Sequence, residues 1–385
     1  MLEDTPKNVV IQRPSQTAGA KDPVLSENPV RVAIITEWLD SWGGAEYVAL
    51  VLHEMFPEAP IFTAVYNPNK VLPLKGADIR PSYLQRWPLV KNHRQLAYPL
   101  MPAAVETYDL REFDVVISSS YGPAKGVLTR PGQLHICYCH TPTRFLWEPG
   151  VDNRLPKHWL AERIATGLRI WDLQAAERPD VMLANSKNVQ ARISKYYRRQ
   201  SEVLYPPVDV DRFTPELGAV EDYFLTSGRL VKQKQTELII QAFKQNKRPL
   251  KIAGTGPEEA RLKELAAGVG NIEFLGFVPD SELERLYAQC AAFVFAAEED
   301  FGIVPVEAMS AGRPVIALGK GGALETVVEG KTGLFFAEPT PESLNSAIKQ
   351  FDGAKWNSKV IRKQAAKFSR ANFESGLHQI IDKNL

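Results

Sequence analysis

The sequence predicts an α/β protein made of two doubly wound domains in tandem, each a parallel sheet covered by helices on both faces. Its 385 residues exceed what one hydrophobic core usually organises. After residue 28, short apolar runs alternate with segments of helical periodicity. Pro206 and Pro207 interrupt this alternation, because consecutive prolines forbid a helix and favour an extended connector. We therefore expect a polar tail over 1–28, a first domain over 29–205, a second domain over 206–358 and a C-terminal helix over 359–385.

The first domain opens with a strand typical of a buried parallel sheet, then a glycine-containing loop and a helix. The helix has apolar residues at helical spacing: Val48, Val51, Leu52 and Met55. Further apolar runs predict more strands of the same sheet. The expected strands are Val30–Ile35, Val115–Ile117, Ile136–Cys139 and Val181–Ala184.

The second domain repeats this pattern. Its expected strands are Tyr223–Thr226, Leu250–Ala253, Ile272–Leu275, Ala292–Phe295 and Val315–Leu318. Ser281 and Glu284 have capping-box spacing and predict the start of an intervening helix. Phe368 and Phe373 are expected to anchor the C-terminal helix. Because ligands bind beyond the carboxyl ends of parallel strands, we expect two facing domains to line a cleft with both sets of loops.

Composition favours a soluble or peripheral protein without a nucleic-acid partner. The 46 basic and 45 acidic residues give a net charge of +1, which argues against a general nucleic-acid binder. Three cysteines cannot form a disulfide framework, so a reducing, cytoplasmic compartment is the simplest expectation. No stretch has the length of a signal-peptide core or of a membrane-spanning helix.

Two glutamates mark the strongest candidate site. Glu299 and Glu307 frame a turn between the apolar run Ala291–Ala296 and a helix with a proline in its first turn. The free amides of Gly302 to Val304 would meet a diphosphate at the positive end of the helix dipole. Two carboxylates beside an anion site would repel it unless hydroxyls occupied them, so we interpret both as sugar and ribose acceptors. A helix-start glutamate favoured by the dipole is the simpler alternative for Glu307.

Three further groups follow strands of the two domains. Arg229 and Lys234 could hold neighbouring phosphates, one as a planar fork and the other as a point charge, or they could be solvated loop residues. Gly43 and Gly44 open a helix and could approach phosphate or acceptor, although a tight turn alone would explain them. His140 ends a strand, where it could bind a sugar hydroxyl or orient the reacting centre, or serve the structure alone.

Three motifs imitate other sites and do not support them. Asp209 and Asp211 resemble a metal clamp but have no third oxygen ligand nearby in sequence. The run that begins at Gly254 lacks the third glycine of the dinucleotide fingerprint, which disfavours NAD. The run that begins at Gly330 resembles the end of a P-loop, but a strand follows where a helix is needed, which disfavours ATP hydrolysis.

A basic aromatic strip lies in the first domain, where no acidic residue occurs between Asp78 and Glu106. Such a strip could touch an anionic membrane surface or a lipid diphosphate, or it could be a solvated helix face. The strip consists of Arg80, Tyr83, Arg86, Trp87, Lys91, Arg94 and Tyr98.

Taken together, these motifs resemble glycosyltransferase family 4, whose members are retaining enzymes of the GT-B fold, over nearly the whole chain after Asn28. The resemblance rests on Gly43–Glu46, Cys139–Pro142, Asn185–Ser186, Ser227–Leu230 with Lys234, Phe274–Val278, and Glu299–Glu307 continuing to Ile316. Leu100–Lys125 and His140–Trp147 resemble the bacterial branch that builds exopolysaccharide or lipopolysaccharide on lipid carriers.

The resemblance implies transfer with retention and without a metal or other cofactor, and a C-terminal helix that packs back on the first domain. It implies that Arg229 and Lys234 bind the donor diphosphate, Glu307 the ribose, Glu299 the hexose, the backbone near Val278 the base, and His140 the hexose near the reacting carbon. The expected catalytic set is His140, Arg229, Lys234 and Glu299. The expected substrate-binding set is Gly43, Gly44, Gly254, Val278, Phe301, Gly302, Ile303, Val304 and Glu307.

We therefore expect a retaining hexosyltransferase that uses a nucleotide sugar and a glycan acceptor, lipid-linked by analogy, at the cytoplasmic face of the inner membrane. UDP-glucose is the first expected donor and GDP-mannose the alternative. A sugar-nucleotide epimerase would convert the donor without any acceptor, and a binding protein would leave the donor unchanged. Asp300 replaces the glycine of many relatives and adds a carboxylate whose role stays open.

Overall fold

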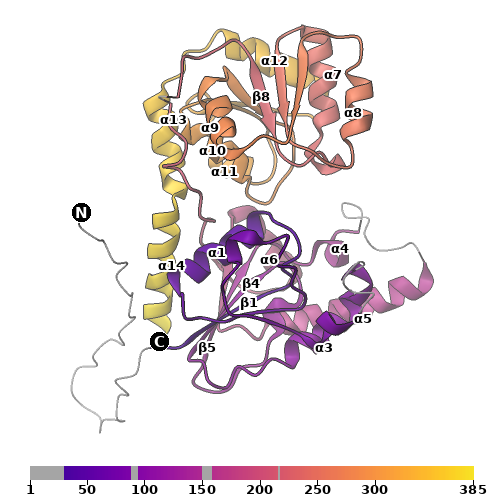
Figure 1. Ribbon diagram of the computed structural model, residues 1–385, viewed down its shortest axis with the longest axis vertical. Coiled ribbons are helices and arrows are strands. Elements are labelled where there is room, and N and C mark those ends of the chain that lie inside the picture. The colour runs from indigo at the N-terminus through magenta and orange to yellow at the C-terminus, as the bar shows by residue number, and fades with distance from the viewer. Residues whose placement is uncertain (1–29, 88–93, 150–157, 216) are drawn as a thin grey trace, which may run out of the picture. The chain divides into compact units, whose positions relative to one another are not determined.

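The computed structural model describes residues 30–87, 94–149, 158–215 and 217–385, which divide into two units (Figure 1). The first unit runs to Leu204 and also includes Glu374–Leu385. The second unit is Tyr205–Phe373. Within these described ranges no helix combines the length and the apolar character needed to cross a bilayer.

The sheet of the first unit is fully parallel, with strand order β3-β2-β1-β4-β5-β6-β7. Its strands are β1 (Val32–Thr36), β2 (Ile61–Thr63), β3 (Ile79–Pro81), β4 (Val115–Ser120), β5 (Leu134–Cys139), β6 (Val181–Ala184) and β7 (Glu202–Val203). The four strands expected from the sequence are confirmed as β1, β4, β5 and β6. The short strands β2, β3 and β7 were not predicted.

Helices and single turns connect these strands. They are α1 (Gly44–Met55), η1 (Leu72–Leu74), η2 (Tyr83–Arg86), η3 (Arg94–Leu100), α3 (Met101–Glu106), η4 (Pro123–Gly126), α4 (Arg144–Trp147), α5 (Trp159–Ala176) and α6 (Lys187–Tyr196). The apolar stripe of α1 is buried at Val48, Val51, Leu52 and Met55, as its spacing predicts.

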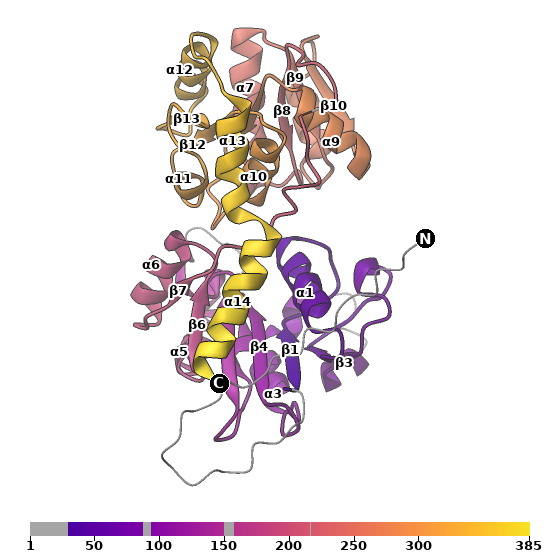
Figure 2. The same ribbon diagram turned by 90° about the vertical axis from the view of Figure 1, so that its left-hand side faces the viewer.

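The second unit contains a six-stranded parallel sheet with order β10-β9-β8-β11-β12-β13 (Figure 2). Its strands are β8 (Phe224–Ser227), β9 (Leu250–Ala253), β10 (Ile272–Gly276), β11 (Ala292–Phe295), β12 (Val315–Leu318) and β13 (Gly333–Phe336). Side chains of β8 alternate between two cores, with Phe224 in one and Leu225 in the other. The expected pattern of two doubly wound domains is therefore confirmed.

Helices cover both faces of this second sheet. They are η5 (Lys232–Lys234), α7 (Thr236–Asn246), α8 (Glu259–Leu265), α9 (Asp280–Gln289), α10 (Ile303–Ser310), α11 (Ala323–Thr326), α12 (Pro341–Asp352), α13 (Ser358–Ala365), η6 (Ala366–Phe368) and α14 (Arg370–Asn384). One layer contains α7, α8 and α12, and the other contains α9, α10, α11 and α13.

Two expectations about helices differ from the structure. The predicted capping box does not form, because α9 begins at Asp280 without a side-chain cap and Glu284 instead pairs with Arg212 over 2.7 Å. The C-terminal segment from residue 359 is not one helix, because it is divided into α13, η6 and α14. Ile361 and Phe368 are buried in the core of the second unit, while residues from Glu374 onward belong to the first unit.

Each sheet contains a topological switch point, where consecutive connections diverge to opposite faces. In the first unit this point lies between β1 and β4, and in the second unit between β8 and β11. The loop after β11 packs against a glycine pair, Gly321 and Gly322, in the loop that follows β12. The N–H of Gly322 donates to the carbonyl of Glu299 over 2.9 Å, and a methyl group at Gly322 would lie 2.3 Å from the backbone of Phe301.

We expect Gly322→Ala to destabilise the second unit by about 1–3 kcal/mol, because the added methyl group must displace the backbone of residues 299–301. Gly322 has φ −66° and ψ −18°, which alanine adopts freely, so the loss would be steric rather than conformational. Chemical denaturation measures the effect. Gly353→Ala is the matched control, since its φ is −88° and its nearest neighbour lies 3.7 Å away. Equal stability of the two variants would contradict the tight packing.

Candidate active site

The candidate site of the second unit forms where β8 and β11 end side by side. Ser227 closes β8 and leads into Gly228, which has a φ of +132°. Gly254 follows β9 with a φ of +128°, and a Cβ there would lie 2.0 Å from the carbonyl oxygen of Gly228. Gly254 therefore allows the β8 and β9 loops to approach closely, and it supports the site through the backbone.

The helix α10 starts directly beside this loop. Gly302 precedes it with a φ of +87°, a left-handed conformation that favours glycine. The N–H groups of Gly302, Ile303 and Val304 have no acceptors inside the helix, because the first turn never supplies them. This end of α10 therefore offers backbone donors and the positive end of a helix dipole to an anion.

The two expected cations differ in their surroundings. Lys234 forms an ion pair with Glu299, and both side chains are about one-quarter exposed. Arg229 is exposed, and no acceptor from the described part of the chain engages its guanidinium. Both cations line a small hollow together with Ser227, Gly228 and the end of β11. Lys234 is therefore neutralised by Glu299, whereas the charge of Arg229 is exposed.

Glu307 is the fifth residue of α10, just beyond the first turn where the sequence places it, and it is partly buried. Its Oε2 accepts a hydrogen bond from the hydroxyl of Tyr287 over 3.1 Å. Burial raises the pKa of Glu307 to about 7, although the Tyr287 hydrogen bond and the cations Arg212 and Lys234 lower it. The carboxyl group therefore changes charge near neutral pH.

The remaining predicted residues of this unit have unequal access to a ligand. Val278 lies between β10 and α9 and is half-buried, beside the exposed Phe277. The side chain of Phe301 is buried and packs against Tyr205 and Phe368, at ring distances of 5.7 and 5.4 Å. Phe301 therefore anchors the loop in the core, and only its backbone can meet a ligand. Asp300 is half-buried within the same loop.

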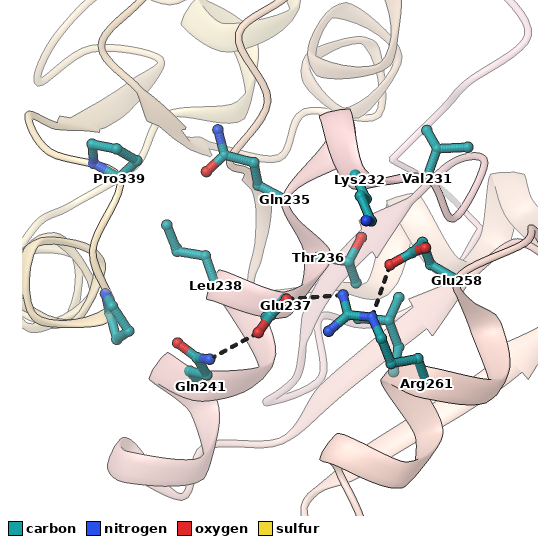
Figure 3. Close-up of a pocket in the computed structure, with 12 residues that line it drawn as sticks. Val231, Lys232, Gln235, Thr236, Glu237, Leu238, Gln241, Glu258, Arg261 and Pro339 are labelled. Atoms are coloured by element: carbon teal, nitrogen blue, oxygen red, sulfur yellow. Dashed lines mark hydrogen bonds and ion pairs between the residues drawn. The ribbon is translucent and has the colours of Figure 1, made fainter. Parts of the chain in front are cut away.

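A larger pocket of about 570 Å³ lies beside α7 but outside this arrangement (Figure 3). Its residues come from the start of α7, from α8 and from the loop before α12. The charged groups at its centre satisfy one another, since Arg261 pairs with both Glu237 and Glu258 at 2.8 Å. None of the expected donor-binding residues lines it.

In the first unit, Gly43 and Gly44 are exposed at the start of α1, just after β1. Two carboxyl groups near the start of α1 are buried: Glu46, whose Oε2 would lie 3.1 Å from a Cβ at Gly43, and Glu37, which follows β1. Oε1 of Glu37 accepts hydrogen bonds from Ser120 Oγ at 2.9 Å and from two backbone amides of the following loop. Burial raises the pKa of Glu37 and of Glu46 to about 7. Both acids therefore carry little charge below neutral pH.

His140 lies at the carboxyl end of β5, as predicted. Its backbone N–H donates to the carbonyl of Ser120 over 2.8 Å, and its Nε2 lies 2.8 Å from Ser119 Oγ. The imidazole packs edge-on against the rings of Tyr121 and Tyr138. Burial lowers the pKa of His140 to about 4, so the ring is neutral at physiological pH. A neutral imidazole can exchange hydrogen bonds with a hydroxyl group but adds no positive charge.

The segment that follows His140 is fixed by one buried carboxylate on α5. Asp172 accepts hydrogen bonds from Thr143 Oγ1 at 2.8 Å, Trp147 Nε1 at 2.7 Å and the Tyr197 hydroxyl at 2.8 Å. Lys125 pairs with the same group at 2.5 Å, and neither charged side chain is exposed by more than 2%. Because removing either partner would leave an uncompensated buried charge, this cluster holds the segment rigidly.

The basic aromatic strip is not continuous in the described part of the chain. Arg80 is neutralised by ion pairs with Asp78 and Glu112. Tyr98 packs against Trp38 and Phe145 rather than facing outward as part of a strip. Lys91 lies outside the described residues, as does the side chain of Arg94.

Sequence reasoning missed the buried groups that support the site. Glu37, Asp172 and Tyr287 carry no motif, and each is identified only by its contacts in the folded chain. The pair Gly321–Gly322 left one usable signal, since two consecutive glycines in the short loop after the strand ending at Leu318 are typical of a close backbone approach.

Comparisons with known proteins agree with this architecture. The chain is 30% identical over 211 residues to the D-inositol 3-phosphate glycosyltransferase of Geodermatophilus obscurus, covering 47% of each protein, so this match spans about half of that relative. It is 27% identical to the alpha-1,3/1,6-mannosyltransferase ALG2 of Mus musculus, over 89% of this chain and 93% of that protein.

Solved structures show the same GT-B fold. The Anabaena protein HepE, solved with UDP and glucose, superposes with a TM-score of 0.67 at 19% identity, covering 91% of this chain and 99% of that one. Sucrose-phosphate synthase from Thermosynechococcus elongatus gives a TM-score of 0.70 at 18% identity, covering 92% and 98%.

Two family descriptions match adjacent parts of the chain. Residues 42–212 match Glycosyltransferase Family 4, and residues 209–368 match Glycosyl transferases group 1. Together the two matches cover most of both units and include Gly43, Gly44 and the loops after β5, β8 and β11. The chain belongs to glycosyltransferase family 4.

Proposed function

We propose that this glycosyltransferase moves a hexose from a nucleotide sugar to a glycan acceptor with retention and without a metal ion. The observation that carries the proposal is the convergence of Arg229, Lys234, Glu299 and the start of α10 at one switch point. Cations and backbone amides there suit a diphosphate, and the carboxylates suit hydroxyl groups.

In the proposed reaction the bond between the hexose C1 and the diphosphate breaks as the acceptor oxygen bonds to C1 on the same face. The acceptor proton passes to an oxygen of the departing diphosphate. Arg229, Lys234 and the α10 amides stabilise the charge that develops on this leaving group. Glu299 accepts hexose hydroxyls, and the neutral His140 exchanges a hydrogen bond with the hexose near C1.

UDP-glucose is the first proposed hexose donor and GDP-mannose the alternative. Among the similar proteins, HepE was solved with UDP and glucose, whereas ALG2 is a mannosyltransferase. The backbone beside Val278 is the proposed base contact, and backbone groups can accept either base. Thermal unfolding with each nucleotide sugar tests the proposal, because a ligand at 100 times its dissociation constant stabilises the fold by about 2.7 kcal/mol. A protein that is stabilised by neither UDP- nor GDP-sugars would contradict it.

We propose that this protein belongs to the branch that builds bacterial polysaccharides and that its acceptor is lipid-linked. Such an acceptor would bring the first unit to the anionic cytoplasmic surface of a membrane. Exposed apolar side chains on α5 support this assignment, since Trp159 is 69% and Ile170 is 58% exposed. Sedimentation with anionic vesicles checks it, and recovery of all protein in the supernatant would contradict membrane contact.

We expect Arg229→Ala and Lys234→Ala each to lower turnover by about 100-fold or more, because each removes a charge from the leaving diphosphate. Transfer assays with UDP-glucose and GDP-mannose measure the loss, and far-ultraviolet circular dichroism checks the fold. Lys232→Ala is the matched control, since Lys232 is an exposed cation on the same turn but lines the other pocket. Turnover like that of the wild type in either test variant would remove that residue from the phosphate site.

We expect Glu299→Ala to lower hexose transfer by about 10- to 100-fold, because hydrogen bonds to a charged acceptor contribute about 1.5–3 kcal/mol. The same change frees Lys234 from its ion pair, so binding of UDP or GDP should be unchanged or tighter. Calorimetric titration and transfer assays separate the two effects. Glu298→Ala, which alters the exposed neighbour, serves as the control. Loss of nucleotide affinity in Glu299→Ala would show that Glu299 binds the nucleotide and not the hexose.

A further inference from the structure

Three side chains of the second unit form a hydrogen-bonded relay around Glu307. Ser227 ends β8, Tyr287 lies on α9 and Glu307 lies on α10. Ser227 Oγ lies 2.7 Å from the Tyr287 hydroxyl, which donates to Glu307 Oε2 over 3.1 Å. A tyrosine hydroxyl carries a single hydrogen, so once it is given to the carboxylate, Ser227 must be the donor toward Tyr287. The relay therefore points from the β8 loop toward the charge on α10.

Tyr287 is held more firmly than the carboxylate that it contacts. Its side chain is fully buried, and its ring packs against Phe213 and Phe293 at centroid distances of 5.3 and 5.6 Å. Glu307 is partly exposed. When a rigid donor bonds to one oxygen of a carboxylate, it fixes the orientation of the carboxylate, so the lone pairs that remain free on the carboxylate point in a fixed direction.

We propose that Tyr287 is a positioning residue that orients Glu307 for the two neighbouring hydroxyl groups of the donor ribose, and so sets the preference for ribonucleotides. The inference rests on the proposed function and on the role that the family resemblance implies for Glu307, which is to bind the ribose. Paired hydroxyls require a carboxylate of defined orientation, whereas a freely rotating one would lose rotamer entropy on binding. Ser227 extends this control to the loop that carries Arg229.

The charge of Glu307 adds a pH dependence to this positioning. Tyr287 bonds to it directly, and the charges that act on it are those of Arg212, Lys234 and Asp280. Burial raises the pKa of Glu307 to about 7, the Tyr287 hydroxyl and the two cations lower it, and Asp280 raises it. A protonated carboxyl group accepts fewer hydrogen bonds, so ribose binding weakens as the pH falls through about 7. The Tyr287 hydroxyl lowers the pKa of Glu307, so removing this hydroxyl should raise that pKa and move the loss of ribose binding to higher pH.

The test compares wild type, Tyr287→Phe and Tyr223→Phe by calorimetric titration at about pH 8 and about pH 6. The probes are UDP and GDP, each beside its 2′,3′-dideoxy counterpart. Tyr223→Phe is the matched control, because it removes a buried hydroxyl that donates to the carbonyl of Leu286 and not to Glu307. Titration of the terminal phosphate affects each nucleotide and its dideoxy counterpart alike, so the ratio of their affinities isolates the ribose contribution.

Of UDP and GDP, one will bind better. We expect wild type and Tyr223→Phe to bind that ribonucleotide about 10-fold or more tightly than its dideoxy counterpart at the higher pH. Tyr287→Phe should reduce this preference at least about 3-fold, and further at the lower pH. An unchanged preference in Tyr287→Phe, or an equal loss of affinity for ribo and dideoxy forms, would overturn the positioning role while leaving the proposed function intact. Absence of binding by every nucleotide to the wild type would overturn the proposed function and this inference together.

Discussion

The candidate site depends on the divergence of two neighbouring parallel strands, β8 and β11. Their hydrogen-bonded pairing fixes where each strand ends, and their connections leave toward opposite faces of the sheet. The loop with Arg229 and the loop with Glu299 therefore both start at the carboxyl ends of these strands and then diverge from each other. Gly302 makes the second loop turn into α10 within a few residues, which keeps the helix start beside the first loop. Sheet topology, rather than any single side chain, brings cations, carboxylates and backbone donors together.

Behind this arrangement, each unit uses buried polar hubs to hold its loops. Glu37 gathers donors from the loop after β4, and Asp172 gathers four donors around the segment after β5. In the second unit, Tyr287 links β8 to α10. A polar group that is buried without its bonds is costly, so the hydrogen bonds to Glu37 Oε1, to Asp172 and to Tyr287 favour one arrangement of these loops. The functional groups themselves then need few contacts and stay accessible, as the exposed Arg229 does.

Sequence patterns were sufficient for most strands of the two sheets, because buried strands leave local signals, while the roles assigned to the site residues stay predictions. The two- and three-residue strands β2, β3 and β7 left none, since a run that short has no periodicity. The capping box at Ser281 failed because a more distant cation, Arg212, engages Glu284 instead. Phe301 was expected to bind substrate from its place in the motif, and only the folded core shows that its ring faces inward. Local patterns thus identify positions, while long-range contacts decide which side chains remain free.

In the proposed donor site, the ion pair between Lys234 and Glu299 would give a preference for an intact nucleotide sugar. A nucleotide diphosphate alone would attract Lys234 and leave Glu299 without its partner. The loss of this ion pair would offset part of the free energy gained from the contact between phosphate and Lys234. A nucleotide sugar would replace both halves of the pair at once, with phosphate at Lys234 and hexose hydroxyls at Glu299. Both side chains are about one-quarter exposed, so the pair itself is weak enough to exchange. The same exchange in reverse would favour release of the nucleotide product after the hexose has left.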